Sequence, residues 1–158
     1  MPKVLIVYYS RSGNTEAMAK LIAEGIKSED VEVELKKVED TDIDDLLSPD
    51  GIILGSPTYY GTMSADIKKL LDDSVKYHGK LDGKVGAAFS SSGGIGGGNE
   101  TTILDMLKAL LIHGMIVQGD HGGDHYGPVA IGKPDDRSAK ECKRRGARVA
   151  KLVKQLTK

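Results

Sequence analysis

The sequence opens with Lys3-Val4-Leu5-Ile6-Val7-Tyr8-Tyr9-Ser10-Arg11-Ser12-Gly13-Asn14-Thr15. The first half of this stretch is an apolar, β-branched run, which predicts a buried strand. The second half is a short loop of hydroxyl side chains with one glycine, and a helical pattern starts directly after it. Because unpaired N–H groups and the helix dipole favour a negative charge at a helix N-terminus, the loop predicts a phosphate site.

The residue types in the loop indicate which phosphate it suits. Ser10, Ser12 and Thr15 offer hydroxyl donors, and Gly13 lets the backbone approach a ligand closely. The G-x-x-x-x-G-K-[ST] loop of nucleoside triphosphate sites is absent, and so is a G-x-G-x-x-G fingerprint after the first strand. A monophosphate is therefore expected. The alternative is an ordinary strand-to-helix turn capped by Ser12 or Asn14.

Apolar runs alternate with helical patterns along the rest of the chain. Strands are predicted at 3–9, 31–36, 51–55, 85–89 and 115–118, with a continuation of the last at 129–131 left open. Helices are predicted at 14–27, 64–75, 100–112 and 138–156, with a short helical turn at 43–47. The buried stripe of the first helix is expected to comprise Ala17, Leu21, Ile22 and Ile26.

This alternation predicts an α/β fold. Near-continuous apolar strands favour a parallel sheet covered by helices on both faces, a three-layer sandwich. Five strands with right-handed crossovers favour the order 2-1-3-4-5. Residues 1–158 are expected to form a single domain, because the length suits one and no linker interrupts it.

Composition narrows the class of protein. The chain has 39% hydrophobic residues, a net charge of −1 and one cysteine, Cys142, which excludes an internal disulfide. No apolar run approaches ~18 residues, so no membrane span is expected. Without a recognisable leader, a cytoplasmic location is predicted.

Charge is unevenly distributed. Residues 28–50 hold ten acids and two lysines, whereas residues 133–158 hold ten Lys/Arg and three acids. The basic stretch is interpreted as a solvated helix face, with a docking surface for an acidic partner as the alternative. No nucleic-acid motif accompanies it, so no nucleic-acid partner is expected.

Two further loops carry unusual residues. Gly55–Met63 places Tyr59 and Tyr60 side by side; their rings can stack on a planar ligand, or one packs inward while the other stays in water. Ser90–Glu100 is rich in glycine and presents its backbone N–H groups. In a 2-1-3-4-5 sheet, the loops after strands one, three and four meet at the switch point, so they are expected to build one site.

These motifs resemble those of a known family. Ser10–Thr15 is similar to the flavodoxin phosphate loop. Gly55-Ser56-Pro57-Thr58-Tyr59-Tyr60-Gly61-Thr62-Met63 resembles the isoalloxazine loop of WrbA-type, flavodoxin-like quinone reductases. Gly96–Leu104, His113-Gly114-Met115 and Tyr126-Gly127 resemble later signatures of that group, so the similarity touches most of residues 3–131.

The resemblance implies bound FMN and a set of residues around it. The phosphate would be wrapped by Ser10, Arg11, Ser12, Gly13, Asn14 and Thr15. The isoalloxazine edge and one face would be lined by Pro57, Thr58, Tyr59, Tyr60 and Gly61. Backbone groups of Ser90, Ser91, Gly93 and Gly94 would contact the pyrimidine side. His113 matches a histidine near the flavin, or else it caps a helix end.

The resemblance also implies a redox function. The expected activity is electron transfer through FMN, with NAD(P)H-dependent quinone reduction of the WrbA type as the alternative. The short connections after strand two and at residues 120–128 favour electron transfer. The expected partner is a redox protein or a quinone with NAD(P)H, and an oligomer is left open. No metal site and no catalytic triad, carboxylate pair or activated cysteine is predicted.

Overall fold

The computed structural model describes all 158 residues and contains one parallel sheet of order β2-β1-β3-β4-β5, in which β6 also pairs with β4. The predicted order 2-1-3-4-5 is confirmed. The strands are β1 (Lys3–Tyr8), β2 (Glu32–Lys37), β3 (Gly51–Pro57), β4 (Val85–Ser92), β5 (Ile116–Val117) and β6 (Val129–Ile131). The α-helices are α1 (Asn14–Lys27), α2 (Ala65–Asp73), α3 (Asn99–Ile112) and α4 (Asp136–Leu156). Three short 3₁₀ helices complete the fold: η1 (Val38–Asp40), η2 (Ile43–Leu46) and η3 (Ser74–Tyr77).

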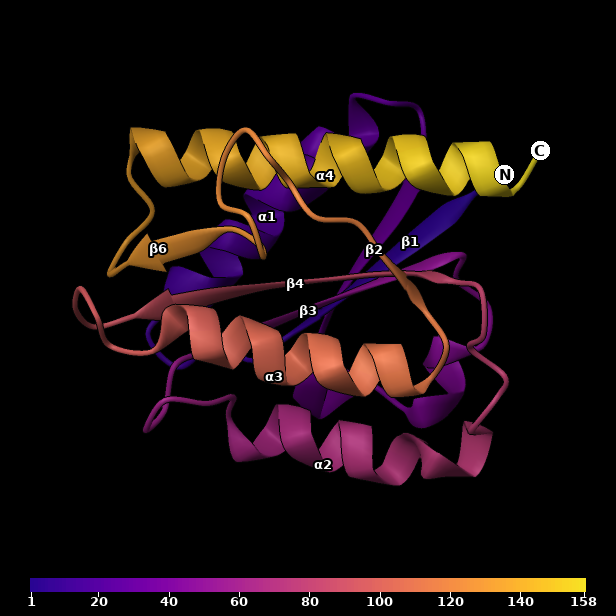
Figure 1. The fold of residues 1–158 in the computed structure, drawn as a ribbon, viewed down its shortest axis with the longest axis horizontal. Helices are drawn as coiled ribbons and strands as arrows, with labels where there is room; N and C mark the ends of the chain where they lie inside the picture. The colour runs from indigo at the N-terminus through magenta and orange to yellow at the C-terminus, as the bar shows by residue number, and fades with distance from the viewer.

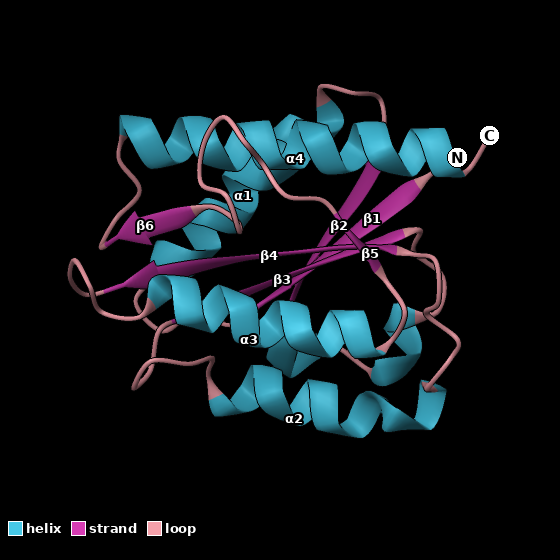
Figure 2. Cartoon of the chain, viewed as in Figure 1, coloured by secondary structure: helices cyan, strands magenta, loops and turns pink.

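The sheet forms the middle layer between two pairs of helices. Helices α1 and α4 cover one face, and α2 and α3 cover the other (Figure 1; Figure 2). Because successive side chains of a strand point to opposite faces, β1 supplies Val4 and Ile6 to the core under α1 and α4 and Leu5 and Val7 to the core under α2 and α3. The expected three-layer sandwich is confirmed.

The fifth strand position is split. The two residues of β5 pair with Val85 and Gly86 at the start of β4, and β6 pairs with Ser90, Ser91 and Ser92 at its end. The continuation at 129–131 is therefore present on the same edge of the sheet. The chain leaves this edge at Gln118, whose carbonyl accepts a hydrogen bond from Arg145 of α4 at 2.8 Å.

Helices α1 and α4 touch backbone to backbone. A Cβ at Gly146 would lie 2.1 Å from the carbonyl oxygen of Ile22, and one at Gly25 would lie 2.1 Å from the carbonyl oxygen of Lys143. This contact corrects the predicted stripe of α1. Ile22 and Ile26 are fully buried, but Ala17 and Leu21 are only half-buried, and the most enclosed positions instead include Met18, Ala19 and Ala23.

Arginines of α4 hold the loop of residues 118–128 through hydrogen bonds. Neither the solvated helix face nor the docking surface, the two interpretations of the basic stretch, predicted this role. Arg144 donates two hydrogen bonds to the buried carboxylate of Asp120, at 2.7 and 2.9 Å, and holds its pKa far below the usual range. Arg145 is buried as well and donates to the carbonyl oxygens of Gln118 and Asp124. Arg148 donates to the carbonyl oxygen of Gly119 at 2.7 Å. No helix in the structure has the length and apolar character that crossing a bilayer requires.

Candidate functional site at the carboxyl ends of three strands

The loop after β1 is closed by one hydroxyl. Ser10 Oγ accepts hydrogen bonds from the backbone N–H groups of Gly13 and Glu16, both at 3.2 Å. Gly13 is the N-cap of α1, with a φ of 96° that favours glycine, and neither Ser12 nor Asn14 caps the helix by its side chain. The alternative, an ordinary strand-to-helix turn capped by the side chain of Ser12 or Asn14, is therefore not what the structure shows.

The donors of this loop fit a phosphate. The N–H groups of Arg11, Ser12, Asn14 and Thr15 make no hydrogen bond within the chain, as expected at a helix N-terminus. Because Ser10 Oγ already accepts two hydrogen bonds, its own proton is left to donate. The side chains of Arg11 and Ser12 are exposed, so positive charge and a further hydroxyl stand at the rim. Such a donor set suits a doubly charged phosphate.

The loop after β3 is a tight hairpin. The Tyr59 N–H donates a hydrogen bond to the carbonyl oxygen of Thr62 at 2.8 Å, and the Thr62 N–H donates one to the carbonyl oxygen of Tyr59 at 3.2 Å. Tyr60 and Gly61 occupy the turn with φ values of 48° and 81°. Tyr59 packs edge-on against Tyr9, with ring centroids 6.1 Å apart, whereas the side chain of Tyr60 is fully exposed. The two tyrosines therefore divide into one packed ring and one free ring, as the alternative for this loop stated.

The loop after β4 is shorter than the sequence indicates. Strand β4 extends to Ser92, so Ser90 and Ser91 are buried strand residues and the glycine-rich loop covers 93–98. The backbone N–H of Ser90 donates to Pro128, and the carbonyl of Ser91 accepts from Thr58 at 2.7 Å. The backbone contact expected from Ser90 and Ser91 to a ligand stays a prediction, and the side-chain hydroxyls of both residues bond within the chain. The N–H groups of Gly93 and Gly94 make no hydrogen bond within the chain and stay available.

Hydroxyl groups join the three loops. Thr15 Oγ1 lies 2.9 Å from Ser91 Oγ, and Thr58 Oγ1 lies 3.0 Å from Ser90 Oγ. Thr102, on the first turn of α3, donates to Thr58 Oγ1 at 3.1 Å. The loops after β1, β3 and β4 thus meet at one place without a charged group in the network. Thr102 was not predicted; the signal was a threonine at a position of α3 that faces the core.

The structure places His113 apart from these loops. It follows the fourteen residues of α3, which at about 1.5 Å per residue puts it roughly 20 Å from the glycine loop. The carbonyl oxygen of the neighbouring Gly114 accepts a hydrogen bond from the N–H of Gly83, just before β4 begins. His113 therefore lies at the amino ends of the strands, whereas the three loops lie at their carboxyl ends. The structure does not bring His113 together with the three loops, and its helix-end alternative describes its position at the C-cap of α3.

The surroundings of His113 define its tautomer. Its Nε2 is 2.8 Å from Ser74 Oγ, and that hydroxyl donates to the carbonyl oxygen of Leu71 at 2.6 Å. Nε2 therefore carries the proton, and the buried Nδ1 has no partner. Burial, and then the nearby His78, lower the pKa of His113.

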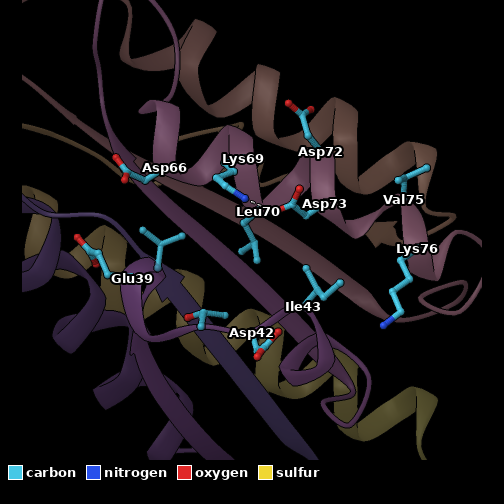
Figure 3. Close-up of a pocket in the computed structure, with 12 residues that line it drawn as sticks. Glu39, Asp42, Ile43, Asp66, Lys69, Leu70, Asp72, Asp73, Val75 and Lys76 are labelled. Atoms are coloured by element: carbon cyan, nitrogen blue, oxygen red, sulfur yellow. Dashed lines mark hydrogen bonds and ion pairs between the residues drawn. The ribbon is translucent and has the colours of Figure 1, made fainter.

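A groove on the surface lies elsewhere. It measures about 610 Å³ between α2 and the short helices η1 and η2, and none of its lining residues belongs to the three loops. Figure 3 shows Glu39 and Asp42 on one wall and Asp66 and Asp73 on the other, with Lys69 paired to Asp73. The groove is acidic and is separate from the three loops.

Comparison with known proteins decides the family. The Flavodoxin family model matches residues 6–126, which include all three loops. The chain belongs to the flavodoxin family. As a member of that family, it is an FMN-binding redox protein that transfers electrons through the flavin.

The relatives include both flavodoxins and quinone reductases, the two groups that the motifs resemble. A flavodoxin of Aquifex aeolicus is 44% identical over 162 residues, covering 97% of this chain and 88% of that protein. An NAD(P)H dehydrogenase (quinone) of Archaeoglobus fulgidus is 32% identical over 190 residues, covering 99% of this chain and all of that protein.

The structures that resemble this flavodoxin include one described as a flavodoxin from the domain Archaea, with a TM-score of 0.81 and 34% identity, covering 96% of this chain and 99% of that one. Another is a WrbA-like protein from Agrobacterium tumefaciens, with a TM-score of 0.84 and 27% identity, covering 98% and 99%.

Proposed function

We propose that this flavodoxin is an electron carrier that exchanges electrons with a partner protein at the edge formed by the three loops. The observation that carries the proposal is how open this edge is. The loop of residues 118–128 is held by Arg144, Arg145 and Arg148 and runs over α4 (Figure 1). The side chains of Tyr60 and Ile95, in the loops after β3 and β4, are exposed. A flavin bound there is reachable by another protein without a substrate entering a closed pocket.

The chain's own residues divide the work of binding. Ser10 and the free N–H groups of Arg11, Ser12, Asn14 and Thr15 hold the phosphate. Pro57, Thr58, Tyr59, Tyr60 and Gly61 line one side of the ring, and the N–H groups of Gly93 and Gly94 meet its polar edge. When bound, FMN supplies the group that accepts and releases electrons. The protein orients the ring and sets how exposed it is.

A quinone reductase is the second candidate, favoured by the relatives named NAD(P)H dehydrogenase (quinone). In that case NAD(P)H and a quinone would use the same open edge in turn. The cytoplasm is the proposed location under either candidate. The single cysteine, Cys142, is a buried free thiol, and burial raises its pKa to about 12, so it takes no part in the chemistry.

An anaerobic titration of the FMN-loaded protein separates the two candidates. For an electron carrier, dithionite reduces the flavin in two resolved one-electron steps seen in the visible spectrum, and neither NADH nor NADPH bleaches it. For a quinone reductase, NAD(P)H bleaches the flavin directly and an added quinone restores the colour. Failure of the purified chain to retain or rebind FMN contradicts both candidates.

A further inference from the structure

The hairpin after β3 and the glycine loop after β4 meet where α3 begins. Gly98 is the N-cap of α3, and a Cβ on it would lie 2.9 Å from the Cα of Gly61 and 3.4 Å from Cγ2 of Thr58. The N–H of Thr58 also donates to the carbonyl oxygen of Ser91 at 2.7 Å. The separation between the two loops is therefore set by what holds Thr58 at the entrance of α3.

Thr102 joins both loops from inside the protein. Its side chain is fully buried, and its hydroxyl oxygen lies 2.8 Å from the carbonyl oxygen of Gly98 and 3.1 Å from Oγ1 of Thr58. Thr102 belongs to the first turn of α3, and the next buried residues of that helix, Ile103 and Met106, pack into the core. The hydroxyl is therefore presented from a fixed base.

The hydroxyls of Thr102, Thr58 and Ser90 form a row that uses all of its protons. Thr58 Oγ1 lies 3.0 Å from Ser90 Oγ, which lies 3.3 Å from the carbonyl oxygen of Ser91. Donation can run from Thr102 through the row to the Ser91 carbonyl. It can also run in reverse, from Ser90 to the Gly98 carbonyl. In both directions every hydroxyl donates within the row, so these side chains hold the loops together.

We propose that Thr102 is a positioning residue, which acts through Thr58 to fix the separation between the hairpin and the glycine loop and so the fit of the flavin ring. This inference rests on the proposed binding of FMN at the three loops, and it divides that site into two separately held parts. The bond between Thr15 and Ser91 holds the phosphate loop. The row that starts at Thr102 holds the ring part, and no hydroxyl belongs to both networks.

The deciding experiment measures the dissociation constants of FMN and riboflavin for the full chain and for Thr102→Val, which keeps nearly the shape of threonine without its hydroxyl. We expect both constants to rise by the same factor, about fivefold, the change made by one hydrogen bond of ordinary strength. The two flavins share the ring and differ in the phosphate, so an equal loss identifies the ring part of the site. Thr102→Ser keeps the hydroxyl and should restore both constants.

A double-mutant cycle tests whether Thr102 acts through Thr58. In a chain that already carries Thr58→Val, adding Thr102→Val should change neither constant further, because the bond between the two side chains is already gone. Thr58 is only half-buried, so Thr58→Val also tests the inference if the buried position does not accept valine. It breaks the same bond and should weaken both flavins by one common factor.

Ser74→Ala is the matched control. It also removes a buried hydroxyl with two hydrogen-bond partners, the carbonyl oxygen of Leu71 and the ring of His113, but it lies outside the three loops. Both dissociation constants should stay unchanged in this variant. Equal losses in Ser74→Ala and Thr102→Val would show a general effect of losing a buried hydroxyl and would overturn the inference.

Amide hydrogen exchange of the flavin-free chain is a second readout. In Thr102→Val we expect the Thr58 N–H to exchange faster, because its bond to Ser91 is then no longer supported from α3. The N–H of Ala17, which donates to Gly13 at 3.0 Å in the phosphate loop, should exchange at an unchanged rate.

The outcomes separate this inference from the proposed function. Unchanged constants in Thr102→Val, or a further loss in the double variant, overturn the role of Thr102 alone. A larger loss for FMN than for riboflavin overturns it too, and so does a chain that binds FMN without binding riboflavin, because the ring part would then not be held separately. A chain that binds no FMN overturns the proposed function, and this inference with it.

Discussion

The hydroxyl of Thr15 lies 2.9 Å from that of Ser91, although the two residues are 76 positions apart in the sequence. Thr15 belongs to the first turn of α1 and Ser91 to the end of β4. Both side chains are buried, so the bond forms where water does not compete. It fixes the phosphate loop to the strand that carries the glycine loop, which places the two halves of the flavin site at a constant separation.

Replacing Ser10 by alanine should weaken FMN binding roughly tenfold or more, because a hydroxyl donor to a charged phosphate and the closure of the loop are both lost. Riboflavin, which lacks the phosphate, should bind equally well to Ser10→Ala and to the unaltered chain. Fluorescence quenching of the two flavins measures both constants. Ser48→Ala is the control, since Ser48 is exposed, its side chain makes no hydrogen bond, and it lies outside the three loops. Equal weakening of FMN and riboflavin would place Ser10 outside the phosphate site.

Gly146→Ala should destabilise the protein by about 1–3 kcal/mol through overpacking against Ile22. At a helical glycine without such a contact, replacement by alanine would instead stabilise the protein, because alanine has the higher helix propensity by about 1 kcal/mol. Urea unfolding measures the difference. Lys140→Ala, at an exposed position of the same helix, should change the free energy of unfolding by less than about 0.5 kcal/mol. A more stable Gly146→Ala variant would show that the two helices can move apart at little cost.

The stability of the protein should fall between pH 7 and pH 5 because of His113. Its pKa is lowered in the folded state by burial and then by His78, so the unfolded chain binds the proton more readily. The contribution of the neutral ring is complete above the unfolded pKa of about 6.5 and is lost as the pH falls toward the folded pKa. Urea unfolding at several pH values should show a smaller decline for His113→Gln. An equal decline in both proteins would assign the effect to other groups.

Asp120→Asn should lower the melting temperature at neutral pH, because the arginines around the loop of residues 118–128 lose their carboxylate. The pKa of Asp120 is depressed mainly by the hydrogen bonds from Arg144, so its contribution is present above the unfolded pKa of about 3.9 and is lost only at strongly acidic pH. The difference in melting temperature between the two proteins should therefore be constant from pH 8 to pH 5. A difference that already disappears at pH 5 would contradict the buried ion pair.

The sheet order and the phosphate loop could be predicted because their signals are local. An apolar strand, a hydroxyl-rich loop and a helix follow each other within residues 3–27, and the same alternation repeats along the chain. The placement of the loops after β1, β3 and β4 then follows from topology alone.

What could not be predicted depends on pairs of residues far apart in sequence. Helix periodicity does not reveal that Gly146 meets Ile22. The predicted stripe of α1 correctly included Ile22 and Ile26 but missed Met18, Ala19 and Ala23. A row of arginines looks the same whether it faces water or, as with Arg144, a carboxylate buried in a distant loop. His113 carries a family motif, but the length of α3 decides where it lies.

The contact between α1 and α4 also constrains the order in which the site matures during synthesis. The phosphate loop is translated before α4, yet the helix that it opens packs against this segment, which is translated more than a hundred residues later. While α4 is still inside the ribosome, Met18 and Ile22 lack one side of their enclosure. We therefore expect a nascent chain to acquire its flavin only after the C-terminal helix has emerged.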